Sequence, residues 1–304
     1  GLSEELKGGF KVLVQNVNDE KATIVSSDLP SGMFGDWNPQ IVNRDTVHAT
    51  LTLAIQFPRL CFFIPDNAEL IGEWKVIDIG LSEKAIQQSP VNFCLVEKKD
   101  VRHRLHHRKE FCSKADFGSA ILYAGSYGMM GAAVLSASGA LRAGVGKLTV
   151  CSPKCGYTIM QSSVPEAMYH YNRGEMNIVD IRPERSFNAI GIGPGIGTHE
   201  LTVKALEDFL ATINQPIVLD ADALNCIAIK PSMLNTIPVL SVLTPHAGEF
   251  DRMFGPQTSG EARLRTAIEK AKYYNIFIIL KGHYTAIVRP DSSKLDTILE
   301  GNEE

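Results

Sequence analysis

The sequence predicts an α/β protein whose second half folds around a doubly wound, mostly parallel sheet. Strand-like and helix-like segments alternate from Ser119 onward, which is the pattern of repeated βαβ units. Glycine-rich or polar segments follow five of those strands. Because ligands of such sheets bind beyond the carboxyl ends of the strands, we expect the functional site at these ends.

Composition limits the class of protein. The chain has 304 residues, of which 44% are hydrophobic and 21% charged, so it is long enough for two globular domains or one large α/β unit. A net charge of −4 provides no general attraction for nucleic acid or for an anionic membrane. Residues 1–20 lack the basic and apolar regions of a secretory signal, and glycines interrupt the charge-free stretch 118–141. We expect a cytoplasmic protein.

The six cysteines are too sparse for a disulfide framework in a chain of this length. Cys151 and Cys155 are spaced almost as zinc ligands are, but no second Cys or His pair stands at a matching interval. We interpret them as small buried residues or as residues without a functional role.

The first 80 residues predict one helix and a series of strands. The helix covers 7–16, where apolar residues stand at positions 10, 13 and 14. The β-branched or apolar runs that predict strands are 22–25, 46–54, 60–64 and 74–79. The first of these runs leads directly into Ser26–Gly32, whose polar residues, proline and glycine are typical of a functional loop at the end of a buried strand.

Residues 81–117 are rich in Glu, Lys, Arg and His, and they include the basic run 103–108. This run could bind a phosphate or a metal. A solvated connector is the favoured interpretation, because no glycine-rich turn or carboxylate accompanies the basic residues. The sequence thus predicts a first domain over 1–84, a connector and domain start over 85–117, and a second domain over 118–304.

The second domain is predicted to alternate strands and helices. The predicted strands are 119–123, 147–151, 188–192, 216–219, 239–243 and 276–280. The predicted helices are 131–143, 201–213 and 260–274.

Two of the strand ends are glycine-rich. Gly125, Gly128 and Gly131 are spaced as GxxGxxG, which departs from the dinucleotide fingerprint but can still present backbone amides to a phosphate. Tight packing of the helix on the strand explains these glycines equally well. The loop Gly191–Gly197 has glycine at every second position, so its backbone could approach a flat ligand closely, or it could be a strained turn with nothing bound.

Three other strand ends carry polar side chains. Asp220 and Asp222 could position a Mg²⁺-phosphate or a substrate hydroxyl, or they could cap the following helix. His246 stands between a proline and a glycine, which favours contact with a ligand. Lys281, followed by Gly282, could offer a charge and free amides to a nucleotide phosphate.

These strand ends, together with the run 124–150, resemble the dehydratase domain of the NAD(P)H-hydrate repair enzymes, which has a ribokinase-like fold. Residues 27–32, 47–54 and 64–80 resemble the carboxyl-terminal part of the companion epimerase domain, which is Rossmann-like. The resemblance implies metabolite repair. The epimerase interconverts the R and S hydrates of NADH and NADPH, and the dehydratase converts the S form to NAD(P)H with hydrolysis of ADP to AMP and phosphate, or with ATP.

The resemblance also implies roles for individual residues. In the epimerase site, Asp28 would contact the hydrate and Ser31 would help to hold K⁺. In the dehydratase site, Lys281 and the four residues after it would bind the nucleotide with Mg²⁺. The other implied hydrate contacts are Gly1, Leu2, Ser3, Glu4 and Glu5 in the epimerase, and Ala132, Gly195 or Gly197, and His246 in the dehydratase; the remaining implied nucleotide contacts are Gly282, His283, Tyr284 and Thr285. A homo-oligomer is expected.

Two departures from the family pattern stand out. Nothing precedes Gly1, where the family places the Asn and Asp that bind K⁺, and residues 291–304 do not match the closing glycine-rich segment with the catalytic Asp. From the sequence we therefore expect a chain truncated at both ends, with little activity of either kind. The alternatives are a ribokinase-like small-molecule kinase, which the epimerase-like segment argues against, and a non-catalytic nucleotide-binding module.

Overall fold

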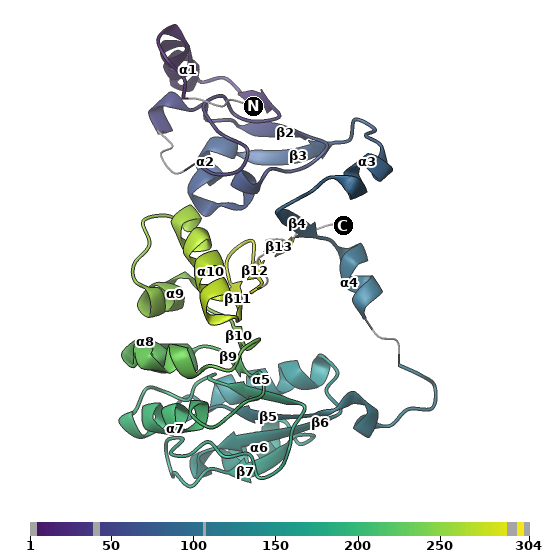
Figure 1. The fold of residues 1–304 in the computed structure, drawn as a ribbon, viewed down its shortest axis with the longest axis vertical. Coiled ribbons are helices and arrows are strands. Elements are labelled where there is room, and N and C mark those ends of the chain that lie inside the picture. The colour runs from purple at the N-terminus through teal and green to yellow at the C-terminus, as the bar shows by residue number, and fades with distance from the viewer. Residues whose placement is uncertain (1–4, 39–42, 106–107, 291–296, 301–304) are drawn as a thin grey trace. The chain divides into compact units, whose positions relative to one another are not determined.

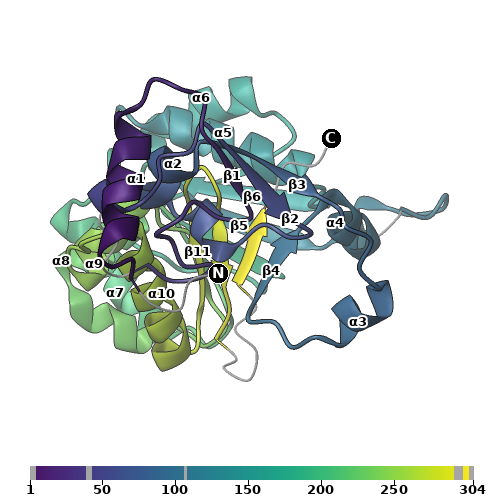
Figure 2. The same cartoon turned by 90° about the horizontal axis from the view of Figure 1, so that it is seen from above.

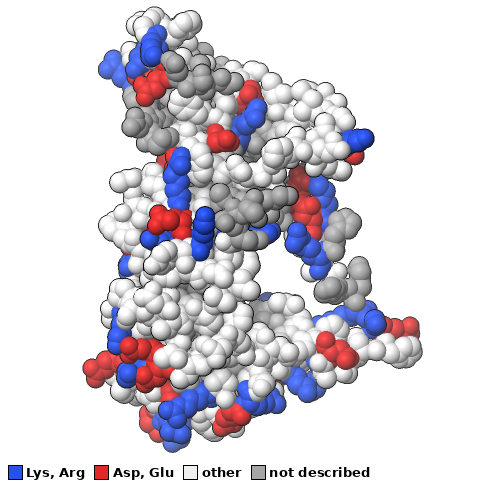
Figure 3. All heavy atoms as spheres, in the orientation of Figure 1, with Lys and Arg blue, Asp and Glu red and all other residues white. Residues whose placement is uncertain are grey.

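The computed structural model describes residues 5–38, 43–105, 108–290 and 297–300, and it divides the chain into two compact units (Figure 1). The first unit comprises Gly1–Cys94 and Gln257–Arg265, and the second comprises Leu95–Pro256 and Thr266–Glu304. Basic and acidic side chains are intermixed on the face shown in Figure 3. Within the described ranges, no helix combines the length and apolar character that crossing a membrane requires.

The first unit contains a three-stranded parallel sheet in the order β1-β2-β3. Its strands are β1 (Val25–Ser27), β2 (Leu51–Ile55) and β3 (Glu73–Ile77), and its helices are α1 (Gly9–Asp19), α2 (Ala68–Ile71) and α3 (Glu83–Gln88). The predicted helix and three of the predicted strands are confirmed with shifted ends. The strand predicted over 60–64 is wrong, because Leu60–Phe63 forms a 3₁₀-helix with all four residues buried. A short, fully buried apolar run does not distinguish a strand from a helical turn.

A ten-stranded sheet carries the second unit, in the order β4-β13-β12-β11-β10-β9-β8-β5-β6-β7. Pairing is parallel from β11 through β7, while β12 is antiparallel to both β11 and β13. The strands are β4 (Phe93–Val96), β5 (Ser119–Tyr123), β6 (Lys147–Ser152), β7 (Met168–Tyr171), β8 (Ala189–Ile192), β9 (Val218–Leu219), β10 (Val242–Leu243), β11 (Phe277–Leu280), β12 (Ala286–Val288) and β13 (Thr297–Glu300). The predicted doubly wound, mostly parallel sheet is confirmed.

The helices of the second unit lie on both faces of its sheet, because successive strands are added to the sheet in two opposite directions. From β5 to β7 the chain moves one way along the sheet, and from β8 to β11 it moves the other way, so right-handed crossovers place the two sets of helices on opposite faces (Figure 2). The helices are α4 (Lys98–Arg104), α5 (Met130–Arg142), α6 (Tyr157–Ser163), α7 (Glu200–Leu210), α8 (Asp222–Ile229), α9 (Ala247–Phe254) and α10 (Gly260–Tyr274), whose first six residues are counted with the first unit.

A hydrophobic core fills the space between the sheet and the helices α5 and α6. Small residues of α5, Ala133 and Ala137, let the helix approach Leu148 and Val150 of β6. The stretch 81–117 contains α3, β4 and α4, so it has regular structure where a solvated connector is predicted. His106 and His107 of its basic run lie outside the described residues.

Candidate functional site

The two glycine-rich strand ends lie against each other in the second unit, because β5 and β8 are neighbours in the sheet. The backbone amide of Gly125 donates to the Pro194 carbonyl at 2.8 Å, and the buried hydroxyl of Ser126 donates to the Gly195 carbonyl at 2.8 Å. Sequence reasoning did not single out Ser126. The two loops therefore form one hydrogen-bonded layer at the carboxyl edge of the sheet.

Gly195 shows why this layer requires glycine. Its φ is +67°, and an added Cβ would lie 2.8 Å from both the Ala132 Cβ and the Met129 carbonyl oxygen. A side chain at this position would thus be strained and would also collide with the start of α5. Ala132, Gly195 and Gly197, three residues predicted to contact the hydrate, are brought close together by this packing.

Asp222, which follows the neighbouring strand β9, forms a hydrogen bond with the glycine loop Gly191–Gly197. Its Oδ2 accepts the backbone N–H of Gly197 at 3.0 Å, and its Oδ1 accepts the Asn225 side-chain amide at 3.0 Å. The proposed alternative of helix capping by Asp220 or Asp222 is wrong, because Ala221, with φ +49°, is the N-cap of α8 and no side chain caps it.

The same network continues to the following helix. Arg252, near the end of α9, donates from Nε to Asn225 Oδ1 at 3.0 Å. Nothing in the local sequence pairs Arg252 with Asn225, which is 27 residues earlier. The glycine loop, α8 and α9 are consequently joined by a continuous chain of side-chain hydrogen bonds through Asp222 and Asn225.

His246 is the N-cap of α9. Its Nδ1 accepts the backbone N–H groups of Gly248 at 3.0 Å and Glu249 at 3.3 Å, while the Glu249 carboxylate accepts the backbone N–H of His246 at 2.9 Å. The His246 ring remains 53% exposed. Accepting at Nδ1 leaves Nε2 as the proton-bearing nitrogen of the neutral ring. The structure thus gives this predicted ligand contact a fixed orientation and an accessible face.

Lys281 brings a positive charge to the same edge. Its Nζ lies 2.8 Å from Asp220 Oδ1 and 3.9 Å from Glu249 Oε2, and its backbone N–H donates to the Pro245 carbonyl at 2.8 Å. The predicted nucleotide residues continue from here, with the His283 and Tyr284 rings edge to face at 4.7 Å. The ammonium is therefore held between two carboxylates at a strand end, 41% exposed.

Asp28, which is predicted to contact the hydrate in the epimerase site, lies in the first unit. It has φ +67°, and both its carboxylate oxygens lie within 3.3 Å of Arg59 Nη2. Ser31 is exposed, and its carbonyl accepts the Val47 N–H at 2.9 Å. Glu5 is exposed, whereas Gly1, Leu2, Ser3 and Glu4 lie outside the described residues. Arg59 is a partner that sequence spacing did not reveal.

Cysteines and carboxylates do not form a metal cluster in the described part of the chain, where no three His, Cys, Asp or Glu side chains converge. Cys61, Cys151 and Cys226 are buried and unpaired with other cysteines, and burial raises the pKa of each thiol to about 12. Cys155 is partly exposed.

Comparison with known families matches both parts of the chain. A family model described as NAD(P)H-hydrate dehydratase matches residues 120–303, and one described as YjeF-related protein N-terminus matches residues 1–61. Since the first match covers more than half of the chain, it identifies the family to which the second unit's fold and strand ends correspond.

Individual relatives agree with this match. A bifunctional NAD(P)H-hydrate repair enzyme of Thermofilum pendens is 29% identical over 96% of this chain, which corresponds to 56% of that protein. An ADP-dependent (S)-NAD(P)H-hydrate dehydratase of Bacillus subtilis is 36% identical over 64% of this chain and 68% of its own length. The chain thus spans little more than half the length of the bifunctional relatives.

Solved structures resemble the chain in the same region. An ADP/ATP-dependent NAD(P)H-hydrate dehydratase of Bacillus subtilis, co-crystallised with ATP/Mg²⁺, is similar over 69% of this chain and 73% of that one, with a TM-score of 0.57 and 32% identity. A ribokinase-like superfamily protein of Enterococcus faecalis has a TM-score of 0.57 at 22% identity, covering 70% of this chain and 73% of its own, which shows the shared fold.

Proposed function

Since the chain belongs to the NAD(P)H-hydrate dehydratase family, we propose that the strand ends of its second unit bind (S)-NAD(P)H hydrate and an adenine nucleotide and remove water from the hydrate. Ala132, Gly195, Gly197 and His246 contact the hydrate in this proposal. Lys281 and residues 282–285 hold ADP or ATP. The product with ADP is NAD(P)H together with AMP and phosphate.

The observation that carries this proposal is that the two hydrogen-bonded glycine-rich loops and Lys281 lie at the same edge of the sheet. Glycines without side chains let a ligand approach the loop backbone closely, and the lysine offers a charge to a phosphate. Phosphoryl transfer to the ring hydroxyl makes it a leaving group, and the ring-nitrogen lone pair then expels phosphate. The oxygen of the removed water leaves within that phosphate, and the neighbouring ring carbon then loses a proton to solvent, which restores the ring double bond of NAD(P)H.

Mg²⁺ is proposed to enter with the nucleotide phosphates. Magnesium is commonly bound by one or two carboxylates together with substrate phosphates. Of the carboxylates at this edge, Asp222 uses both oxygens for hydrogen bonds, and Glu249 is buried and accepts the backbone N–H of His246. Asp220 is paired with Lys281 through Oδ1 alone. Asp220 is therefore the carboxylate with an oxygen left to face a nucleotide-bound ion, which would neutralise phosphate charge.

The first unit is proposed to contribute to epimerisation of the R and S hydrates, as the bifunctional relatives are named for both repair steps. Asp28, held by Arg59, is the residue we assign to the hydrate there. For K⁺, Ser31 is the predicted ligand, and it offers one side-chain hydroxyl. One hydroxyl by itself does not fit a potassium ion. We further propose that the protein is cytoplasmic and forms a homo-oligomer.

Calorimetry with (S)-NADPH hydrate and with ADP, run beside a turnover assay, tests the dehydratase proposal. We expect both ligands to bind and His246→Ala to weaken binding of the hydrate more than binding of ADP. Recovery of the reduced nicotinamide absorbance with ADP and Mg²⁺ would establish dehydration. Phosphorylation of a hydroxymethylpyrimidine would instead favour a small-molecule kinase, and binding of both ligands without turnover would favour a nucleotide-binding module.

A further inference from the structure

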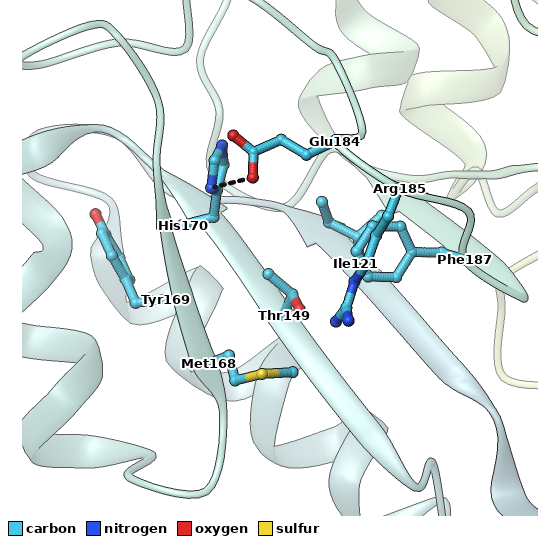
Figure 4. A pocket seen from close by; sticks show the side chains of 8 residues that line it. All are labelled: Ile121, Thr149, Met168, Tyr169, His170, Glu184, Arg185 and Phe187. Atoms are coloured by element: carbon cyan, nitrogen blue, oxygen red, sulfur yellow. Dashed lines mark ion pairs between the residues drawn. The ribbon is translucent and has the colours of Figure 1, made fainter. Parts of the chain in front are cut away.

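A cavity of about 410 Å³ lies in the second unit, away from the loops that end its strands (Figure 4). Its floor crosses three neighbouring strands, because Ile121 of β5 is paired with Thr149 of β6, and Thr149 is paired with Met168 of β7. His170, two residues after Met168, lies on the same side of the sheet. The full lining is Ile121, Thr149, Met168, Tyr169, His170, Glu184, Arg185 and Phe187.

The course of the chain explains why a cavity exists here. The alternate residues of β6, Leu148 and Val150, pack with α5 and α6 on the opposite face of the sheet. The connection from β7 to β8 crosses the cavity side without forming a helix, and it supplies Glu184, Arg185 and Phe187 as a wall. The face of β5–β7 opposite α5 and α6 is thus bounded by an irregular segment in the described part of the chain.

The charged groups of the cavity are not equivalent. Glu184 Oε2 lies 3.7 Å from His170 Nδ1, so these two side chains face each other at one side of the cavity (Figure 4). The Arg185 guanidinium lies over the Phe187 ring, 5.0 Å from its centroid. Among the side chains that the structure describes, no carboxylate forms an ion pair with Arg185.

We propose that this cavity binds a small amphiphilic anion, one carboxylate or phosphate group on an aromatic or aliphatic body. Arg185 would pair with the anionic group, since a guanidinium carries donors that match two oxygens at once, and the Phe187 ring orients it. Ile121, Met168 and Phe187 supply the apolar surface for the body of the ligand. The volume falls within the range of small-molecule sites, about 300–1,000 Å³.

Ligand-observed NMR and calorimetry with benzoate and phenyl phosphate, in the presence of saturating ADP, test the site. We expect at least one of the two anions to bind, and benzyl alcohol and inorganic phosphate, which each lack one half of the chemistry, to bind at least about tenfold more weakly. Binding of benzoate but not phenyl phosphate, or the reverse, identifies the anionic group. Binding of the probe only when ADP is left out would overturn the proposal, because the probe would then occupy the strand-end site.

Two variants check the assignment to these residues. Arg185→Gln should weaken anion binding about tenfold, and Arg182→Gln, a charge loss on the same segment outside the lining, should leave it unchanged. Met168→Glu places a carboxylate on the half-exposed floor and should abolish binding while the fold is kept. If no probe binds and Met168→Glu instead lowers the oligomeric state in sedimentation, the face is an interface between copies and the proposal is wrong.

Discussion

The carboxylate of Asp222 accepts the backbone N–H of Gly197 at 3.0 Å, across 25 residues of sequence. The bond joins the first turn of α8 to the glycine loop that follows β8, and Cys226 Sγ lies 3.6 Å from the carbonyl oxygen of the same glycine. Gly197 is thereby held at both its donor and its acceptor, with φ +71°. The position of the glycine loop is therefore fixed by α8 as well as by its own turn.

Removing this anchor should loosen the loop. We expect Asp222→Ala to lower the free energy of unfolding by about 1.5 kcal/mol, since a hydrogen bond to a charged group is lost, and to weaken hydrate binding. Urea unfolding followed by circular dichroism and calorimetry with the hydrate measure the two effects. Asp208→Ala, which removes only an exposed pair with Lys204, is the control and should change neither. Unchanged hydrate affinity in Asp222→Ala would show that the anchor does not shape the site.

The ion pair of Lys281 with Asp220 leads to a second prediction. Lys281→Met should weaken ADP binding about tenfold, because the phosphates lose a cation and face two carboxylates, Asp220 and Glu249. Lys281→Arg should restore part of the affinity. Lys230→Met removes a comparable lysine that is paired with Glu207, and it should bind ADP normally. Equal ADP affinities for the wild type and Lys281→Met would place the nucleotide elsewhere.

His246 combines a capping role with a proposed contact role, and the two can be separated. Asn is a good N-cap, so His246→Asn should keep the thermal stability of the wild type while losing the exposed imidazole edge. His246→Ala should lose about 1 kcal/mol as well, because Gly248 and Glu249 lose their acceptor. Hydrate titrations beside thermal melts compare the variants. Hydrate affinity that follows stability rather than the imidazole would indicate a purely structural histidine.

Sequence reasoning succeeded where local pattern determines structure. The strand Ser119–Tyr123 and the helix Gly260–Tyr274 have the predicted bounds, because an apolar run before a glycine and a long amphipathic segment are both local signals. The strand predicted over 239–243 shortens to Val242–Leu243, since Leu240 has φ +62° and cannot continue a strand. The pairs Asp222–Gly197 and Arg252–Asn225 depend on how distant loops meet, which no local pattern encodes.

The buried thiols predict a loss of stability in alkali. Cys226 has a folded pKa of about 12, raised by burial from the ordinary 9.0, so above pH 9.0 the unfolded chain loses this proton while the folded chain keeps it. The protonated thiol therefore makes its full contribution to the free energy of unfolding below pH 9.0, and this contribution is lost as the pH rises toward 12. The slope contributed by one such thiol is about 1.4 kcal/mol per pH unit.

The Cys226→Ala variant tests this slope. Its free energy of unfolding, measured by urea titration and circular dichroism at a series of alkaline pH values, should fall less steeply than that of the wild type. Cys112→Ala is the matched control, because Cys112 is exposed. Parallel slopes for the wild type and Cys226→Ala would mean that the thiol titrates alike in both states.

The conformation of Asp28 supports a prediction for the first unit. With φ at +67°, the backbone is in the left-handed region, which Asp and Asn tolerate better than Ala and which glycine adopts freely. Asp28→Ala loses the Arg59 ion pair and also strains the backbone, by about 1–2 kcal/mol, whereas Asp28→Gly loses only the ion pair. Trp37 and Trp74 are the two tryptophans of the chain and both lie in the first unit, so tryptophan fluorescence during urea unfolding reports on this unit alone. Asp28→Gly should be the more stable of the two variants, and equal stabilities would show that the backbone at Asp28 stores no strain.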